Sequence, residues 1–265
     1  MRRIRPAVAT AAALALGLAF VGSGSPAGAQ DPPSNVRIVH ALDLTGDGVG
    51  GTPVTVCLND AIVDSDFRVG ESIGPVALDP GTYNVEIFGG GAPNCDGTPV
   101  LAAQPSVPSG ADLTAMAAWD VTADAATIAV VSDDVACVED GSGRVTARHA
   151  ADVGTVDVLA DGGVLFAGLP NLGQASGDVP AATYAVGIAP TGSLTPVIGP
   201  VDLPVPAAID TQVYAYGGVE GPAGVFIVEA PLTVCAVPIQ TTTTTAPTPT
   251  TTAAAPATVT PSFTG

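Results

Sequence analysis

The chain of 265 residues is long enough for two domains of ordinary size, and it carries 25 acidic against 7 basic residues, a formal net charge of −18. All the basic residues are arginines. Binding to phosphate backbones and anionic headgroups depends on cationic side chains, so this composition disfavours nucleic acid and direct membrane insertion of the mature form. An acidic surface favours solubility and attracts divalent cations or basic partners.

Residues 1–29 have the pattern of an export signal. The segment MRRIRP is cationic, AVATAAALALGLAFVG is apolar, and Ala27-Gly28-Ala29 provides the small-x-small pattern that signal peptidase cleaves. The apolar run is too short and wrongly flanked for a membrane span. We therefore expect cleavage before Gln30 and an exported mature chain with four arginines against the 25 acidic residues.

After the signal, the same series of short strands occurs twice. VRIVHALD matches VTARHAAD, VTVCLNDAIV matches VDVLADGGVL, LDPGTYNVEI matches VPAATYAVGI, and ATIAVVSDDVACV matches GVFIVEAPLTVCAV. Because the order of these matches is kept, the sequence predicts a tandem duplication with domains at residues 32–138 and 143–238. The boundary falls in EDGSG, residues 139–143.

Each repeat has the alternation typical of β-strands. In TYNVEI the residues Tyr83, Val85 and Ile87 alternate with polar ones, and TYAVGI repeats this pattern. Turn formers such as LDPG, ADGG and PTGS separate the strand-like runs. The predicted fold class is all-β, with two tandem antiparallel β-sandwich domains of immunoglobulin-like architecture. Trp119 and Tyr216, at matching places of the repeats, are expected to be the main large core side chains.

Several of these segments resemble a known family. The opening NVRIVHA, the acidic loop after it and PGTYNVEI are similar to the secreted bacterial family named domain of unknown function 4397, whose members begin with a strand ending in His-Ala. Both repeats show the resemblance, over residues 34 to about 237. The second repeat departs from the family pattern in HAADVGTVDV, which lacks the prolines common after His-Ala. The resemblance implies an extracellular, often envelope-associated protein and no established activity.

The only two histidines, His40 and His149, stand at the ends of matching strands. Side chains alternate along a strand, so His40 shares a face with Ile38. A histidine there most often pins the following loop through a backbone carbonyl or a carboxylate, for which Asp43 and Asp152 are candidates. The alternative is a metal ligand or catalytic base, but the sequence lacks the motifs of known hydrolases and zinc sites. We therefore expect both histidines to be structural.

The loop DLTGDGVGGTPV is seven residues longer than its counterpart and is the best candidate for a ligand site. Asp43, Thr45 and Asp47 have the spacing of the first half of a calcium loop, where alternate oxygens wrap a hard cation. The twelfth position is Val54 where such loops have Glu, and Asp/Gly runs are usually solvated hairpin tips. Calcium is thus a weak possibility, and no other cofactor is expected.

The four cysteines of an exported chain predict two disulfides, with three possible connectivities. Cys57 and Cys95 lie in one repeat and have no counterparts in the other, so they most simply bond to each other. Cys137 and Cys235 remain at matching ends of the repeats, and their bond would tie the interdomain linker to the end of the second domain. A zinc or redox site is disfavoured because C-x-x-C spacing is missing.

Residues 239–265 form a Thr/Pro/Ala-rich tract that predicts a disordered tail or stalk. Taken together, the sequence favours a non-enzymatic exported module of the bacterial envelope or extracellular space, with a structural or binding role. Its partner would be an unknown envelope or extracellular protein or glycan. Two alternatives stay open: a calcium-dependent adhesin or carbohydrate-binding protein, and a hydrolase with an unrecognised acidic site.

Overall fold

The structure, a computed structural model, describes residues 31–217, 221 and 223–236. The expected signal and tail lie outside these residues. The described residues form strands and no helix, which confirms the all-β class. The strands of the first half are β1 (Ser34–His40), β2 (Val54–Leu58), β3 (Ala61–Phe67), β4 (Ser72–Leu78), β5 (Gly81–Thr82), β6 (Val85–Gly89), β7 (Leu101–Ala103), β8 (Ser106–Val107), β9 (Asp112–Asp120) and β10 (Ala125–Ser132). Those of the second half are β11 (Ser142–His149), β12 (Val156–Ala160), β13 (Gly163–Leu169), β14 (Gln174–Pro180), β15 (Ala182–Pro190), β16 (Ile198–Val205), β17 (Ile209–Tyr216) and β18 (Gly224–Pro231).

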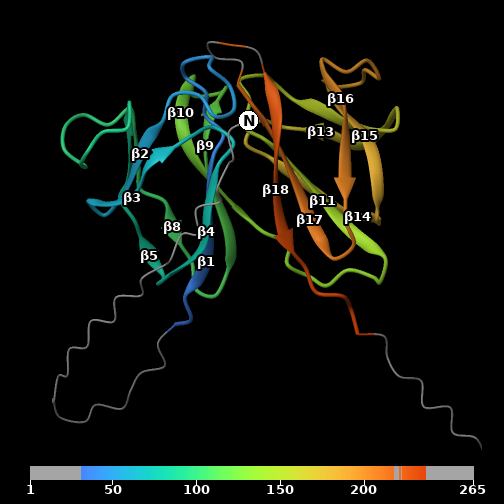
Figure 1. The fold of residues 1–265 in the computed structure, drawn as a ribbon, viewed down its shortest axis with the longest axis horizontal. Coiled ribbons are helices and arrows are strands. Elements are labelled where there is room, and N and C mark those ends of the chain that lie inside the picture. Colours follow the sequence, from blue (N-terminus) through green and yellow to red (C-terminus); the bar gives the residue numbers. More distant parts are fainter. Residues whose placement is uncertain (1–30, 218–220, 222, 237–265) are drawn as a thin grey trace, which may run out of the picture.

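Each half contains two four-stranded sheets, and the neighbour order is the same in both halves. Figure 1 shows the two halves side by side. The first half has β10-β9-β1-β4 and β3-β2-β6-β7, with a small extra pair, β5 and β8. The second half has β18-β17-β11-β14 and β13-β12-β15-β16. In this order β11 corresponds to β1, β12 to β2, β15 to β6 and β17 to β9.

One strand pair in each half differs from the antiparallel expectation. β1 pairs with β9, and β11 pairs with β17, in parallel, whereas the other paired strands are antiparallel. A parallel pair needs a crossover connection, and here the chain passes through the second sheet of its half before it returns beside the first strand. The prediction of purely antiparallel sheets was therefore wrong at this pair.

The core lies between the two sheets of each half. In the second half, one continuous cluster joins Val145 and Ala147 of β11 to Val158 of β12 and Leu203 of β16. In the first half the buried residues fall into two clusters, with a cavity of about 40 Å³ lined by members of both. The place of Leu203, which is buried, is taken there by Pro105, which is only half-buried.

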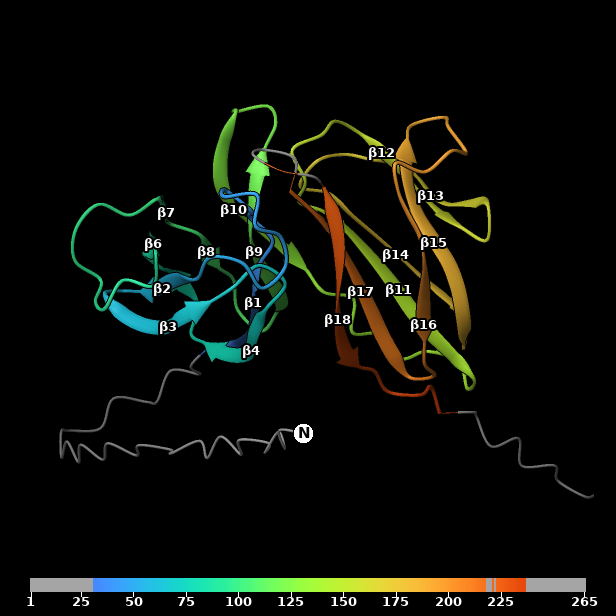
Figure 2. The same ribbon diagram turned by 45° about the horizontal axis from the view of Figure 1, so that its top comes forward.

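A further cluster lies between the halves, where the sheet β10-β9-β1-β4 faces the sheet β14-β11-β17-β18. Val39 and Met116 of the first half pack there with Tyr214, Tyr216 and Phe226 of the second. The four sheets thus form successive layers, with β2 and β3 on one outer side and β15 and β16 on the other (Figure 2). Both faces of the two central sheets are covered, so β11 and β17 are buried along almost their whole length.

Trp119 and Tyr216 do not occupy matching places, contrary to the prediction. The two histidines lie opposite Ala117 and Ala215 in the parallel pairs, so the residue that corresponds to Tyr216 is Ala118. A shift of one residue turns a side chain to the other face of a sheet. Trp119 accordingly packs against the core of the first half, whereas Tyr216 packs between the halves.

The two disulfides have the predicted connectivity. Cys57 of β2 is bonded to Cys95 in the loop between β6 and β7. Cys137, in the linker after β10, is bonded to Cys235 after β18. The residues next to these cysteines, Val138 and Val234, form a parallel β-bridge that reinforces the second bond. The linker between the halves is therefore covalently attached to the end of the second half.

Replacing Cys137 and Cys235 by serine should lower the free energy of unfolding by about 5 kcal/mol, because this bond closes the longer loop of the unfolded chain, at a sequence separation of 98. The matched control is the double serine variant of Cys57 and Cys95, whose separation of 38 predicts a loss of about 4 kcal/mol. Urea unfolding of both variants measures the difference. A larger loss from the Cys57–Cys95 pair would contradict the loop-length explanation.

Candidate functional site

Both histidine rings are buried at the ends of β1 and β11. His40 is 3% exposed and His149 is 0% exposed. Nδ1 of His40 accepts a hydrogen bond from the N–H of Leu42 at 3.4 Å, and Nε2 of His149 donates to the carbonyl of Gly154 at 2.8 Å. The partners are thus backbone groups of the following loop. Among the described residues, neither ring is bonded to the nearby aspartate.

The two rings are neutral at pH 7. Burial lowers the pKa of His40 to about 4, and the negative charge of Asp43 opposes this shift only in part. Burial also lowers the pKa of His149, while its hydrogen bond to Gly154 acts in the opposite direction. A neutral imidazole donates through one nitrogen and accepts through the other, so the contact with Leu42 assigns the proton of His40 to Nε2.

A cavity of about 140 Å³ adjoins His40 where the long loop leaves β1. We call it the His40 cavity. Its floor consists of buried side chains, His40, Leu42, Asp43, Val69 and Ile87. Its rim consists of exposed residues, Thr45, Thr52, Gly89, Gly90 and Val100. The cavity is therefore open at the surface and ends on an imidazole that lies beside aliphatic groups and the carboxylate of Asp43.

The aspartates of the long loop bind the loop itself. The carboxylate of Asp43 accepts three backbone N–H bonds from the five residues that follow, at 2.8 to 3.3 Å. The carboxylate of Asp47 accepts the hydroxyls of Thr52 at 2.5 Å and Thr45 at 2.9 Å, and these bonds lower its pKa. In the part of the chain that the structure describes, no group of three or more His, Cys, Asp or Glu side chains is placed to hold a metal ion. Calcium would have to replace existing hydrogen bonds.

Arg148 lies between the halves, and its side chain is fully buried. In the second half, its guanidinium donates to the amide oxygen of Gln212 at 2.9 Å and to the hydroxyl of Tyr214. In the first half, it donates to the hydroxyl of Thr114 at 3.0 Å and to the carboxylate of Asp133. Its Nε donates to the amide oxygen of Gln174 on β14 at 3.2 Å. Its donors are thus shared between three strands and the linker, which fixes one half against the other.

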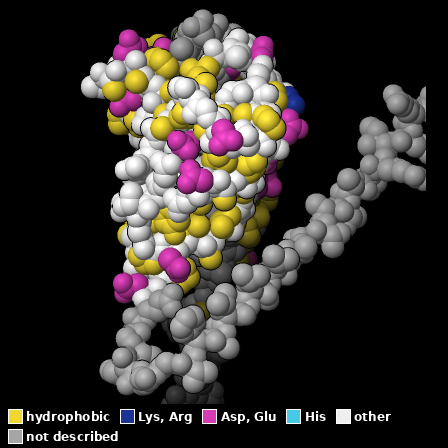
Figure 3. Space-filling model, turned by 90° about the vertical axis from the view of Figure 1, so that its left-hand side faces the viewer, with side chains coloured by type: hydrophobic (Ala, Val, Ile, Leu, Met, Phe, Trp, Pro, Cys, Tyr) yellow, Lys and Arg dark blue, Asp and Glu magenta, His cyan; other side chains and the backbone are white. Residues whose placement is uncertain are grey.

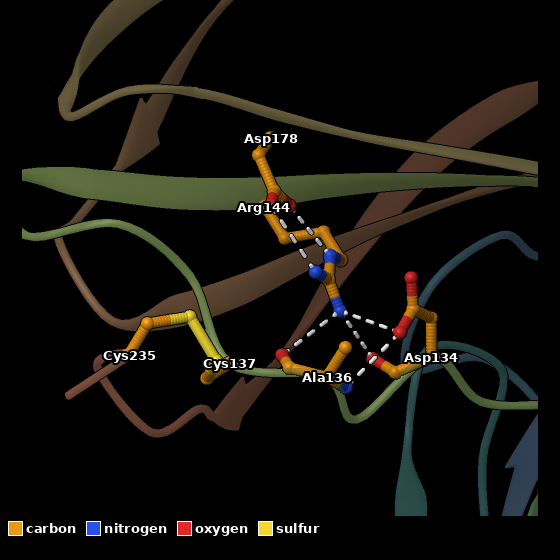
Figure 4. Close-up of a disulfide and its surroundings, with 6 residues drawn as sticks. All are labelled: Asp134, Ala136, Cys137, Arg144, Asp178 and Cys235. Carbon is orange, nitrogen blue, oxygen red and sulfur yellow. Dashed lines mark hydrogen bonds and ion pairs between the residues drawn. A yellow bond between two sulfur atoms is a disulfide. The ribbon is translucent and has the colours of Figure 1, made fainter. Parts of the chain in front are cut away.

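Arg144 makes a second connection to the linker (Figure 4). Its Nε donates to the carboxylate of Asp178 at 2.7 Å. Its NH1 donates to the carbonyls of Asp134 at 2.7 Å and Ala136 at 3.3 Å and pairs with the Asp134 carboxylate at 3.0 Å. The disulfide beside it holds the same stretch of linker (Figure 4). The hinge between the halves is therefore restrained both covalently and by charge-assisted bonds.

A polar cleft of about 210 Å³ lies between the halves, and its lining includes partners of Arg148. Its walls carry Arg37 and Asp112 from the first half and Asp210 and Gln212 from the second. Burial raises the pKa of Asp210, while hydrogen bonds from Gln212 and Thr146 act in the opposite direction. A carboxyl of this kind is a candidate proton donor or binding group.

The sequence analysis missed this interface and its cleft. Arg37, Arg144 and Arg148 alternate along their strands with residues that face the core, and such positions normally point to solvent. A usable signal was present: these are three of the four arginines within the described residues, and all three lie on strands β1 and β11. When the few cationic side chains of an acidic protein lie on two matching strands, the strand faces that carry them are expected to contact carboxylates.

The outer surface is acidic. Figure 3 shows acidic side chains scattered among apolar and polar ones on the outer side of the first half. The remaining arginine of the described residues, Arg68, pairs with Asp66 at 2.6 Å. Little positive charge is therefore left on the described surface to bind an anionic partner.

The described chain is thus an all-β protein whose two similarly connected halves are joined through buried arginines. Residues 34–159, the first half and the start of the second, match the family model described as Domain of unknown function (DUF4397). This match supports the family resemblance for that part of the chain. The described residues contain no helix long and apolar enough to cross a membrane.

Two further comparisons add no functional information. A search of the curated proteins found no match. Among solved structures, the Bacillus anthracis TIE protein is similar with a TM-score of 0.18 and 11% sequence identity. The similarity covers 77% of this chain and 32% of that chain, and the score is too low to carry an argument.

Replacing Arg148 by methionine should lower the free energy of unfolding by about 3 to 5 kcal/mol, because Asp133 and Gln212 lose a buried partner. The control is Arg68→Met, which breaks an exposed pair and should change stability by less than about 1 kcal/mol. Chemical unfolding of both variants gives the comparison. Equal stability of the two variants would show that the buried arginine does not hold the halves together.

Acidification should destabilise the fold through His40. Its folded pKa of about 4 lies below the ordinary 6.5, so between these values the unfolded chain binds more protons than the folded one. The free energy of unfolding is therefore unaffected by the titration of His40 well above pH 6.5, and it should fall by about 2 to 3 kcal/mol by pH 4.5 as the unfolded chain takes up the proton. Unfolding free energies of the wild type and His40→Asn, measured at both pH values, isolate this contribution from that of Asp210, which has the opposite sign. Identical pH dependence of the two proteins would show that His40 does not cause the loss of stability in acid.

Proposed function

We propose that the chain is an exported, non-enzymatic module of the bacterial envelope or extracellular space with a binding role. We propose further that its halves are two copies of one immunoglobulin-like β-sandwich, modified by one parallel strand pair. The common sheet order and the family match to the first half support this reading. The two disulfides support an oxidising compartment outside the cytoplasm.

The restrained interface is the observation that carries the proposal. Halves of a chain move against each other by default unless the interface is large and apolar or otherwise fixed. Here three features restrain the interface between the halves and its linker: the buried guanidinium of Arg148, the ion pairs of Arg144 and a disulfide. A pair of domains held in this way suits the presentation of a fixed binding surface better than closure around a substrate.

The state of the histidines supports a binding role over catalysis. A general base works best when its pKa lies near the working pH. A buried His40 with a pKa of about 4 is a weak base and stays uncharged at pH 7. His149 is occupied by the loop carbonyl of Gly154. Neither ring is set up to take a proton from a substrate.

One observation favours the hydrolase alternative. Asp210 has a raised pKa and lines the polar cleft together with a second carboxylate, Asp112, and acid-base catalysis uses pairs of carboxyl groups in different surroundings. Both oxygens of Asp210 are however engaged, by the hydroxyl of Thr146 and the amide of Gln212, each at 2.8 Å. This engagement favours a role in holding the interface.

The test is sedimentation of the mature chain, starting at Gln30, with isolated bacterial envelopes in calcium and in EDTA. Equal binding in both, unchanged in Asp47→Ala, is expected, because the loop oxygens are already hydrogen-bonded. Binding that is lost in EDTA and in Asp47→Ala would establish the calcium-dependent adhesin instead. Hydrolysis of glycoside, ester or peptide reporters that is abolished in Asp210→Asn would establish the hydrolase, and absence of any binding would overturn the proposal.

A further inference from the structure

We propose that the His40 cavity binds a small neutral amide, of the acetamido type, through the Nε2–H of His40. The proposal rests on the binding role proposed above and gives it a site and a ligand class. It depends on three observations: the same histidine in the second half, the longer loop of the first half, and the lining of the cavity. None of them involves the acidic loop as a metal site.

The second half shows what the histidine binds when its loop is short. His149 corresponds to His40, since each lies at the end of the parallel pair that its strand forms. Its Nε2 donates to the amide carbonyl of Gly154 at 2.8 Å. That carbonyl belongs to the loop that follows β11, which reaches the next strand, at Val156, in seven residues. A backbone amide thus serves as the natural partner of this imidazole.

The first half keeps the histidine and removes the partner. The loop after β1 takes fourteen residues to reach Val54, and the carboxylates of Asp43 and Asp47 hold its turns by hydrogen bonds within the loop. Among the described residues, Nε2 of His40 makes no hydrogen bond, although the residue is only 3% exposed. The open space beside this ring is the His40 cavity. A donor that is paired in one half therefore faces an open cavity in the other.

The lining selects the chemistry of the ligand. An N–H donor requires an oxygen acceptor, which a cationic group does not offer. The nearby carboxylate of Asp43, whose charge acts on His40, disfavours an anion. The aliphatic floor of Leu42, Val69 and Ile87 favours a methyl or similar group beside the acceptor. A neutral amide with a methyl substituent satisfies all three conditions.

The size and position of the cavity allow such a group to enter. Its volume of about 140 Å³ is several times the roughly 30 Å³ that one water molecule occupies in the liquid. Val100 lies on the rim and is 50% exposed. Its counterpart in the second half is Val197, because both donate a backbone hydrogen bond to the isoleucine of the same sheet position, at 2.8 Å. Val197 is 71% exposed and lines none of the cavities described above.

The experiment follows the two Nε2–H signals by nuclear magnetic resonance in the mature protein, which has only two histidines. The probes are N-acetylglucosamine and N-acetylglycine amide, with glucose and glycine amide as the matched compounds that lack the acetyl group. We expect saturable shifts of the His40 signal with the acetylated probes and no shift of the His149 signal. A response to the sugar alone or to the peptide alone identifies the source of the amide, and either supports the site.

Val100→Trp tests the cavity without touching the histidine. Its bulk at the rim should weaken binding of the acetylated probes about tenfold or more, whereas Val197→Trp should bind as the wild type does. Both positions are exposed, so both variants should fold. Unchanged binding in Val100→Trp, equal shifts of both histidine signals, or no response to any acetylated probe would overturn the proposal.

Envelope sedimentation separates this proposal from the one on which it rests. If the wild type sediments with envelopes but no acetylated probe shifts the His40 signal, the cavity assignment is wrong and the binding role stands. If the probes bind and envelopes do not, the cavity assignment stands and the envelope role is wrong. Loss of sedimentation in Val100→Trp, with retention in Val197→Trp, supports both together.

Discussion

The burial of Arg148 between the halves is the constraint on which the rest of the arrangement depends. A guanidinium taken out of water is costly unless its donors are paired. Its partners lie on β9, β14 and β17 and in the linker, so they can meet the side chain only when the halves adopt one orientation. That orientation also brings Met116 and Tyr214 together in the apolar part of the interface. Charge pairing thus sets the register, and apolar burial covers the remaining surface.

The same strand end leads to two different surroundings in the two halves. A short loop returns a carbonyl to the ring of His149, whereas a long loop held by Asp43 leaves space beside His40. Both halves have the buried, uncharged imidazole at this strand end, and they differ in the length of the chain that follows it. The local difference arises from loop length, because the strands and their pairing are the same. Loops of this kind commonly carry the function of a rigid β framework.

Much of the framework could be predicted from the sequence, because alternation and cysteine spacing are local signals. The all-β class and the pairing of Cys57 with Cys95 followed from them. The failures came from contacts that are far apart in the sequence. The alignment of Trp119 with Tyr216 was wrong by one residue, and Tyr216 therefore packs between the halves and not in the core of the second half. Arg148 stood where a solvent-facing residue is expected, and only the gathering of three scarce arginines on two matching strands indicated that another sheet covers it.

The distribution of charge explains why an uncharged ligand suits this molecule. Three of the four arginines within the described residues lie at the interface, and the fourth is paired with an aspartate at the surface. Anionic groups therefore meet carboxylates on the outside and beside His40. A neutral group avoids this repulsion and needs only one donor and an apolar contact. Because all the residues that line the His40 cavity belong to the first half, from His40 to Val100, such a group would bind without any movement of one half against the other.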